Sequence, residues 1–182
     1  MSEIEACIFR GTVADAGDLS RLSAALFPLG CPANTKPEDL ADYIQRELTP
    51  ERFCKWLEDE RTVILVVKVA EEFAGYALIA PGSPPSQSPA HAQYELRKFY
   101  IDAAYHGRGT SDALMKEVIM VADGRWEGAL WLSVFSENPR AISFYKRWGF
   151  RIVGTQDFLV GADSQKDYLM CRTDADRERQ VI

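Results

Sequence analysis

Residues 94–115 place a strand-like run, a turn with two glycines and a helix-like run in an order that suits phosphate binding. Gly107 and Gly109 lack a Cβ, so the backbone there can adopt a positive φ or approach a ligand closely. A helix that begins near Thr110 has free N–H groups and a dipole that favours negative charge at its first turn. This turn is therefore predicted to bind a phosphate or pyrophosphate, and the alternative is a purely structural turn.

The turn differs from the common nucleotide-binding loops. It lacks the third glycine of a dinucleotide fingerprint and the Gly-Lys-Ser/Thr ending of a nucleoside triphosphate loop. No metal site is predicted, because the chain has two histidines, His91 and His106, and its cysteines form no C-x-x-C pair. The cysteines are expected to be reduced thiols: Cys7, Cys31, Cys54 and Cys171.

Two motifs carry a resemblance to a known family. The run from Glu95 to Ile101, followed by His106 to Met115, resembles the coenzyme A signature of the GNAT acetyltransferase superfamily, Q/R-x-x-G-x-G/A after a strand ending in Tyr-Val. His106 stands at the Gln/Arg position and Ser111 at the final Gly/Ala position. Residues 130–150 resemble the later motif of the same family, in which a strand leads to Asn138 and a helix carries Tyr145 before Gly-Phe.

The resemblance implies an α/β GNAT fold. It would have a central mixed, mostly antiparallel sheet of about six to seven strands, flanked by about four to five helices, with splayed strands that hold acetyl-CoA as co-substrate. The resemblance implies that backbone N–H groups make most phosphate contacts and that an N–H of residues 99–101 stabilises the oxyanion. The implied cofactor-binding residues are Phe99, Tyr100, Ile101, His106, Gly107, Arg108, Gly109, Thr110, Ser111, Asn138 and Lys146.

Several of these residues also have simpler interpretations. Asn138 can serve only as a helix cap, and His106 can be a solvent-facing turn residue. Arg108 and Lys146 are candidates for phosphate contacts, but each can equally be an ordinary surface charge.

Acetyl transfer to an amine needs an acid and a route for the amine proton. An alkylammonium with a pKa of about 10.4 loses its proton at pH 7 at a cost of roughly 4 to 5 kcal/mol, so a base or a water relay matters. In the resembled family a tyrosine at the position of Tyr145 protonates the leaving thiolate; otherwise Tyr145 is a core aromatic residue. Glu95 matches the catalytic glutamate of histone-modifying members, and the alternative is a water relay with Glu95 lining the pocket.

Residues 153–170 are similar to bacterial members of the PaiA type, which are grouped with spermidine/spermine acetyltransferases. Gln156 replaces a histidine of that pattern. Three acidic residues are candidates for contacts with a polycation, or are simply solvated: Glu137, Asp157 and Asp163.

The pattern of apolar residues predicts the remaining elements. Strands are expected at 7–13, 62–69, 73–79, 128–135, 151–155 and 167–172. Helices are expected after Asp18, after a capping box of Thr35 and Glu38, from Thr49-Pro50, from Thr110 to near Gly124, and from Pro139. Residues 81–90 contain four prolines and are expected to form a loop that reaches toward the acceptor or stays away from it.

Length and composition indicate one domain over residues 1–182, with 173–182 as a solvated tail. The chain is 47% hydrophobic and 26% charged, as in globular proteins, and no apolar run reaches the roughly 20 residues that span a membrane. Acids near the N-terminus argue against a signal peptide, so a cytoplasmic location is expected. A net charge of −6 argues against nucleic-acid binding.

The sequence therefore predicts an N-acetyltransferase that moves the acetyl group of acetyl-CoA directly to a primary amine, such as a small amine or polyamine. Direct transfer is favoured because no cysteine lies beside a candidate base in the motifs. The alternatives are a protein lysine or N-terminal acetyltransferase, a non-catalytic acyl-CoA-binding module, and a structural domain. A homodimer is possible, because dimers are frequent in the resembled family.

Overall fold

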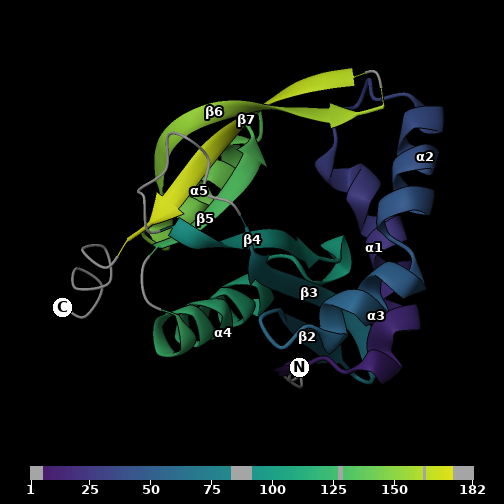
Figure 1. Cartoon of the computed structure of the whole chain (residues 1–182), viewed down its shortest axis with the longest axis vertical. Helices are drawn as coiled ribbons and strands as arrows, with labels where there is room; N and C mark the ends of the chain where they lie inside the picture. Colours follow the sequence, from purple (N-terminus) through teal and green to yellow (C-terminus); the bar gives the residue numbers. More distant parts are fainter. Residues whose placement is uncertain (1–5, 83–91, 127–128, 162, 174–182) are drawn as a thin grey trace.

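The computed structural model describes residues 6–82, 92–126, 129–161 and 163–173. They form a seven-stranded mixed sheet in the order β1-β2-β3-β4-β5-β7-β6 (Figure 1). All neighbouring strands are antiparallel except β4 and β5, which are parallel. The strands are β1 Ala6–Arg10, β2 Val63–Val69, β3 Glu72–Pro81, β4 Ala92–Ile101, β5 Ala129–Phe135, β6 Arg151–Val160 and β7 Asp163–Arg172.

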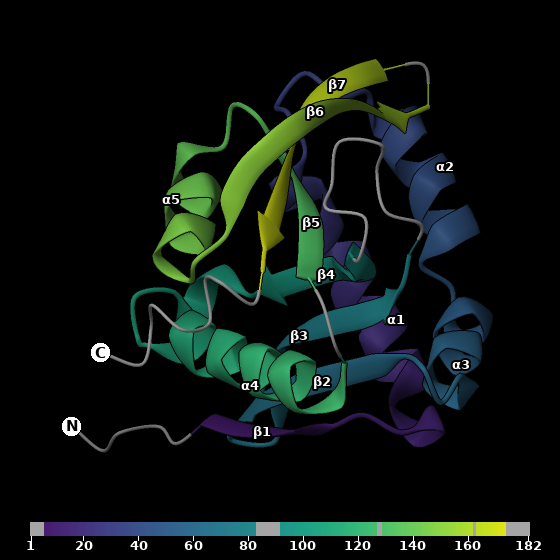
Figure 2. The ribbon, with the colours of Figure 1, turned by 60° about the vertical axis from the view of Figure 1, so that its left-hand side comes forward.

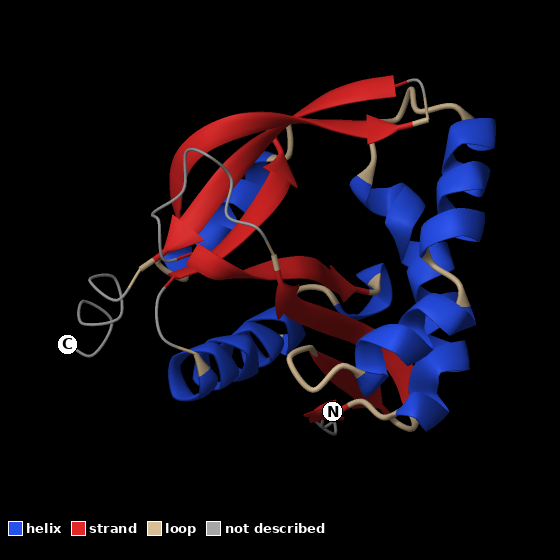
Figure 3. Ribbon diagram, viewed as in Figure 1, coloured by secondary structure: helices blue, strands red, loops and turns tan. Residues whose placement is uncertain are grey.

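Helices cover both faces of β1 to β4. The strand β2 alternates, so that Val63 and Leu65 face one core and Ile64 and Val66 face the other. The first core contains residues of α4, and the second contains residues of α1 and α3. Figure 3 shows α4 on one side of these strands and α1 and α3 on the other. Figure 2 shows α5 beside β5 to β7. The helices are α1 Ala16–Leu26, α2 Pro37–Glu47, α3 Pro50–Glu58, α4 Thr110–Arg125 and α5 Pro139–Arg147.

The sheet divides between β4 and β5. These strands pair only at their beginnings, where Glu95 lies opposite Trp131 at the last paired position. Beyond Glu95 the strand β4 continues beside β3 alone, so one edge of residues 96–101 is unpaired in the described sheet. The two strands diverge from this point (Figure 1), as the prediction of splayed strands requires.

A β-bulge interrupts β4 at Arg97. Lys98 lies opposite Leu78, but Leu96 lies opposite Ile79, so Arg97 is an extra residue in the pairing with β3. Since side chains alternate along a strand, the extra residue places Lys98 on the same face as Glu95 and Arg97. The core contacts agree: Leu96 joins the α4 side of the sheet, whereas Tyr100, two residues after Lys98, joins the α1 and α3 side.

Several predicted local features are confirmed. The strand, turn and helix of residues 94–115 are β4, a turn and α4. The helix expected from Thr49-Pro50 is α3, which begins at Pro50. The expected cap at Asn138 also forms, because its side chain accepts a hydrogen bond from the Ala141 N–H at 3.0 Å. Strands β2 and β3 form the expected hairpin, and Glu71 in its turn has a positive φ of 68°.

Other predictions are wrong in detail. The capping box of Thr35 and Glu38 does not form: Lys36 is the residue before α2, and Pro37 occupies the first turn. Thr35 is buried, and its hydroxyl instead accepts a hydrogen bond from Gln165 of β7. The first strand ends at Arg10, because a 3₁₀ turn begins at Val13.

The last two strands are longer than predicted, so Gln156 and Asp157 lie within β6 rather than in a loop. Most of the proline-rich loop of residues 81–90 and nearly all of the expected tail lie outside the described residues. Among the helices that the structure describes, none is long and apolar enough to cross a membrane.

Candidate active site

A cavity of about 1070 Å³ opens where β4 and β5 diverge. One end lies between the turn before α4 and helix α5, and we call it the α5 end; His106, Gly109, Asn138 and Tyr145 line it. The opposite end lies between helices α2 and α3 and the β6–β7 hairpin, and we call it the α2 end. Its wall comprises Tyr43, Glu47, Arg52, Trp56, Glu95, Arg97, Lys98, Phe158, Gln165 and Asp167.

Most residues that the sequence singles out line this one cavity. Those on its wall are Glu95, Phe99, Tyr100, Ile101, His106, Gly107, Gly109, Ser111, Asn138 and Tyr145. Arg108, Thr110 and Lys146 are not on the wall. Thr110 is buried at the start of α4, whereas Arg108 and Lys146 are exposed. The divergence of β4 and β5 thus opens one cavity, and residues of both motifs line it.

The glycines of the turn adopt the conformation that their lack of a Cβ permits. Gly107 and Gly109 have φ values of 72° and 78°, and Gly109 is the residue before α4. A Cβ added to either glycine would meet nothing within 4 Å, so the space beside the turn is open. The His106 Nε2 lies 2.9 Å from the Ile101 carbonyl oxygen and donates to it, which holds the turn against the end of β4. An open helix N-terminus of this kind suits an anion.

We expect Gly109→Ala to lower the free energy of unfolding by about 1 to 2 kcal/mol, because an L-residue is disfavoured in the left-handed region. Gly124→Ala is the matched control: Gly124 lies within α4, also with nothing near its added Cβ, and alanine there should be stabilising by up to about 1 kcal/mol. Urea unfolding measures both changes. Equal stability of Gly109→Ala and the parent would mean that the turn does not need a positive φ.

Tyr145 is held on the cavity wall by aromatic neighbours. Its ring centroid lies 6.2 Å from that of Phe99, 5.6 Å from that of Phe144 and 5.9 Å from that of Phe150. Among the described residues its hydroxyl has no hydrogen-bond partner. Burial raises the pKa of Tyr145 well above its ordinary value, so the phenol keeps its proton at neutral pH. A protonated, unbonded phenol on a cavity wall can act as a proton donor.

Two arginines of α5 line the cavity although the motifs did not indicate them. Arg140 and Arg147 lie seven residues apart, which is two helical turns, and so share a face of α5 with Phe144. That spacing is a signal that could have identified them. Arg147 is paired with Asp112 of α4 at 3.2 Å, and the Trp148 Nε1 donates to the same carboxylate at 3.1 Å. Arg140 therefore brings positive charge to the α5 end, whereas the charge of Arg147 is paired with Asp112, which also lines the cavity.

One carboxylate oxygen of Glu95 is bound by Arg97, the extra residue of the bulge. The Arg97 Nε donates to the Glu95 Oε2 at 3.0 Å, and another nitrogen of Arg97 donates to the Pro81 carbonyl at 3.2 Å. The carboxylate therefore faces the cavity with one oxygen already bound to a guanidinium.

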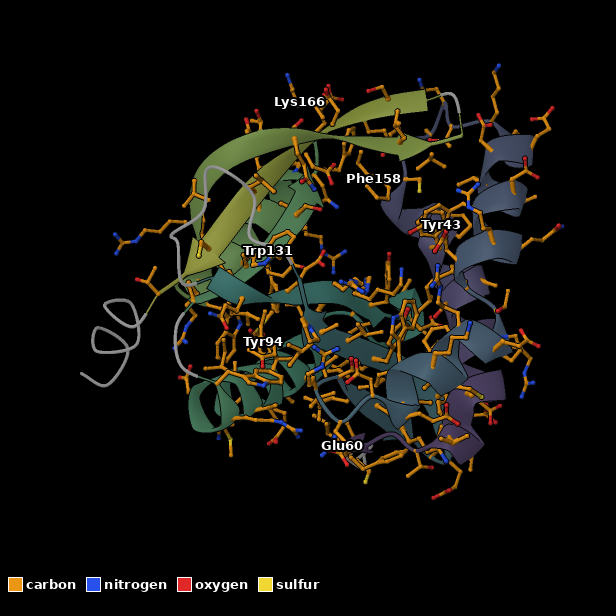
Figure 4. All side chains as sticks on the ribbon, viewed as in Figure 1. Tyr43, Glu60, Tyr94, Trp131, Phe158 and Lys166 are labelled. Atoms are coloured by element: carbon orange, nitrogen blue, oxygen red, sulfur yellow. The ribbon has the colours of Figure 1, made fainter. Side chains whose placement is uncertain are left out.

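The α2 end combines aromatic rings with paired charges. Tyr43 of α2 and Phe158 of β6 have ring centroids 6.1 Å apart (Figure 4). Burial raises the pKa of Tyr43 to about 12, and the hydrogen bond from Arg52 lowers the pKa of Glu47. Asp167 accepts a hydrogen bond from Ser133, and burial raises its pKa. This end is therefore aromatic and contains few free charges.

Two of the three acidic residues that the sequence linked to a polycation lie away from this cavity. Glu137 and Asp157 are exposed and do not line it. The side chain of Asp163 is outside the described part of the structure. The carboxylates of the α2 end are Glu47, Glu95 and Asp167, from three different elements.

Comparisons with known proteins agree with this arrangement. The model of the acetyltransferase (GNAT) family matches residues 30–150. An uncharacterised N-acetyltransferase of Mycobacterium tuberculosis (strain ATCC 25618 / H37Rv) is 36% identical over 158 residues, which cover 87% of this chain and 97% of the relative. Spermine/spermidine N(1)-acetyltransferase of Bacillus subtilis (strain 168) is 28% identical over 88 residues, which cover 48% of this chain and 58% of that enzyme.

Among solved structures, the PaiA N-acetyltransferase from Thermoplasma acidophilum in complex with coenzyme A has a TM-score of 0.73. It is 16% identical in sequence, and the match covers 93% of this chain and 99% of that chain. This likeness concerns the fold, and the family match and the mycobacterial relative concern the sequence. The chain therefore belongs to the GNAT acetyltransferase family and is a GNAT-type N-acetyltransferase.

Proposed function

We propose that the protein transfers the acetyl group of acetyl-CoA directly to a primary amine of a small molecule. The observation that carries this proposal is the position of Tyr145, whose unbonded hydroxyl lies on the wall of a cavity that runs from the glycine turn to the α2 end. A cavity that only bound the cofactor would not need a proton donor there.

Acetyl-CoA is proposed to bind at the α5 end. The N–H groups at the start of α4 would receive the pyrophosphate, with Gly107 and Gly109 allowing its close approach. Arg140 would add positive charge. The unpaired edge of residues 96–101 would accept the pantetheine arm through strand-like hydrogen bonds. Asn138 caps α5 with its side-chain oxygen, which leaves its amide nitrogen for the cofactor.

The proposed reaction has three steps. The neutral amine attacks the thioester carbonyl, and a backbone N–H of residues 99–101 stabilises the negative oxygen that forms. The C–S bond then breaks, and Tyr145 donates its proton to the departing thiolate. The amine nitrogen loses its protons to a water relay or to Glu95, whose second carboxylate oxygen is not bound by Arg97. Counted from the ammonium form of the acceptor, the nitrogen loses two protons: one restores the Tyr145 phenol, and the other is released together with the amide and the free thiol.

The likeness to the spermine/spermidine enzyme of Bacillus subtilis supports a polyamine as the acceptor. The wall of the α2 end does not favour it, because Glu47 and Glu95 are each already paired with an arginine.

The test is thiol release from acetyl-CoA with a panel of polyamines, aryl and alkyl amines, amino acids and lysine peptides. We expect release that depends on one class of acceptor. If acetyl-CoA raises the melting temperature but no acceptor causes release, the protein is an acyl-CoA-binding module instead.

A further inference from the structure

Lys98 is a buried cation on the wall of the α2 end. Its side chain comes from the bulged part of β4, and the residue is 6% exposed. The Lys98 Nζ lies 5.8 Å from the ring centroid of Tyr43 and 6.0 Å from that of Trp56. Within the described parts of the chain Lys98 forms no hydrogen bond and no ion pair. A lysine this buried ordinarily has a partner, so its solitary position needs an explanation.

The neighbouring charges do not supply that partner. Arg52 donates to Glu47 at 2.6 Å, and Arg97 donates to Glu95 at 3.0 Å, so each of these carboxylates is already paired with a guanidinium. Asp167 accepts its hydrogen bond from Ser133. Lys98 is therefore the cation of this wall that has no carboxylate partner among the described residues, and the charges that act on it most are the already paired Arg97, Glu95, Glu47 and Arg52.

Aromatic rings reduce the cost of this charge but do not neutralise it. The attraction between a cation and a ring offsets only part of the cost of burying an unpaired charge. An occupant with a negative group would complete the site, and a polycation would be repelled by it.

We propose that Lys98 binds a carboxylate of the acceptor, so that the acceptor is a small molecule with both a primary amine and a carboxylate. A single carboxylate matches the single unpaired cation, and the rings of Tyr43, Trp56 and Phe158 suit the carbon skeleton of such a compound. This inference rests on the proposed function, because it names the substrate class of the same cavity.

The pH dependence of acceptor binding follows from the same geometry. Burial is the main cause that lowers the pKa of Lys98 to about 8, and Arg97 and Arg52 lower it further, while Glu95 and Glu47 oppose them. Lys98 is therefore mostly charged at pH 7 and loses its charge as pH rises through about 8. The KM for a carboxylate acceptor should rise across that range. The other titratable groups that share this end are Tyr43, Asp167 and the thiol of Cys31.

The experiment compares matched acceptors at pH 7: free amino acids, their amides, the corresponding decarboxylated amines and spermidine. For the parent we expect kcat/KM for the preferred amino acid to exceed that for its amide at least tenfold. In Lys98→Met this ratio should fall to about one, mainly through KM for the acid. Lys68→Met is the matched control, because Lys68 also lies near two aromatic rings but is outside the cavity. It should keep the ratio of the parent.

A binding measurement separates this inference from the proposed reaction. Calorimetric titration compares N-acetyl amino acids with N-acetyl amino amides, with coenzyme A present. The parent should bind the acids at least tenfold more tightly than the amides, and Lys98→Met should bind both alike. Acid-selective binding without thiol release from any acceptor would remove the proposed function and keep the subsite. Thiol release with amides, decarboxylated amines or spermidine at rates equal to the acids, or unchanged selectivity in Lys98→Met, would overturn the carboxylate subsite while keeping the transferase.

Discussion

Tyr145→Phe is expected to lower kcat by roughly 100-fold, as for the loss of a general acid, and to change KM for acetyl-CoA little. The phenylalanine ring preserves the packing against Phe99 and Phe150, and the hydroxyl has no partner among the described residues, so removing it breaks no hydrogen bond there. The melting temperature should therefore be maintained. Steady-state thiol release and thermal unfolding measure the two effects.

Tyr94→Phe is the matched control for this prediction. Tyr94 stacks on Trp126 at a centroid distance of 4.0 Å and does not line the cavity, so its hydroxyl should not affect kcat. If Tyr145→Phe retains more than about a third of the parent kcat, the proton on the leaving thiolate comes from solvent or another group. A poorly folded Tyr145→Phe would be recognised by its melting temperature before any kinetic conclusion is drawn.

Lys98→Met is expected to stabilise the protein at pH 7, by on the order of 3 kcal/mol at most. The pKa of Lys98 is about 8 in the folded protein and 10.5 without the fold, and each pKa unit corresponds to about 1.36 kcal/mol. At pH 7 the folded parent must hold the buried charge, whereas methionine has a similar length and no charge. Urea unfolding of both proteins measures the difference.

The sign of the pH dependence follows from proton binding. Between pH 8 and 10.5 the unfolded chain holds a proton on Lys98 that the folded protein has lost, so the stability of the parent rises with pH. The advantage of Lys98→Met is therefore full below pH 8, shrinks as pH rises and disappears above 10.5. Lys68→Met, at a less buried position, should change stability by no more than about 1 kcal/mol. A Lys98→Met variant less stable than the parent at pH 7 would mean that the charge is already compensated in the free protein.

Local sequence signals predicted the parts of the fold that local chemistry determines. The glycine turn before α4, the helix start at Thr49-Pro50 and the cap at Asn138 depend on residues a few positions apart, and all three form as expected. The capping box at Thr35 failed because a contact with Gln165, distant in sequence, occupies the threonine hydroxyl. A short stretch of sequence does not reveal a tertiary contact with a residue that is distant along the chain.

The α2 end could not be predicted for a similar reason. Regular alternation along β4 would place Lys98 beside Leu96 in the core against α4, and only the extra residue at Arg97 moves it to the cavity. The residue types of β4 do not predict the bulge. The divergence of β4 from β5 was expected from the resemblance. The charged residues that face each other across this opening also come from α2, α3 and β7, which the two motifs do not include.

The contact between the β6–β7 hairpin and the early helices also bears on how the protein folds. Gln165 bonds to Thr35 across 130 residues of chain, and Gly161 lies so close to Asp39 that any side chain there would collide with it. Contacts this distant in sequence carry a large loop-closure entropy and tend to form late. The α2 end of the cavity should therefore be the last part to assemble during folding and the first to open under mild denaturant, before the turn at Gly109 is disturbed.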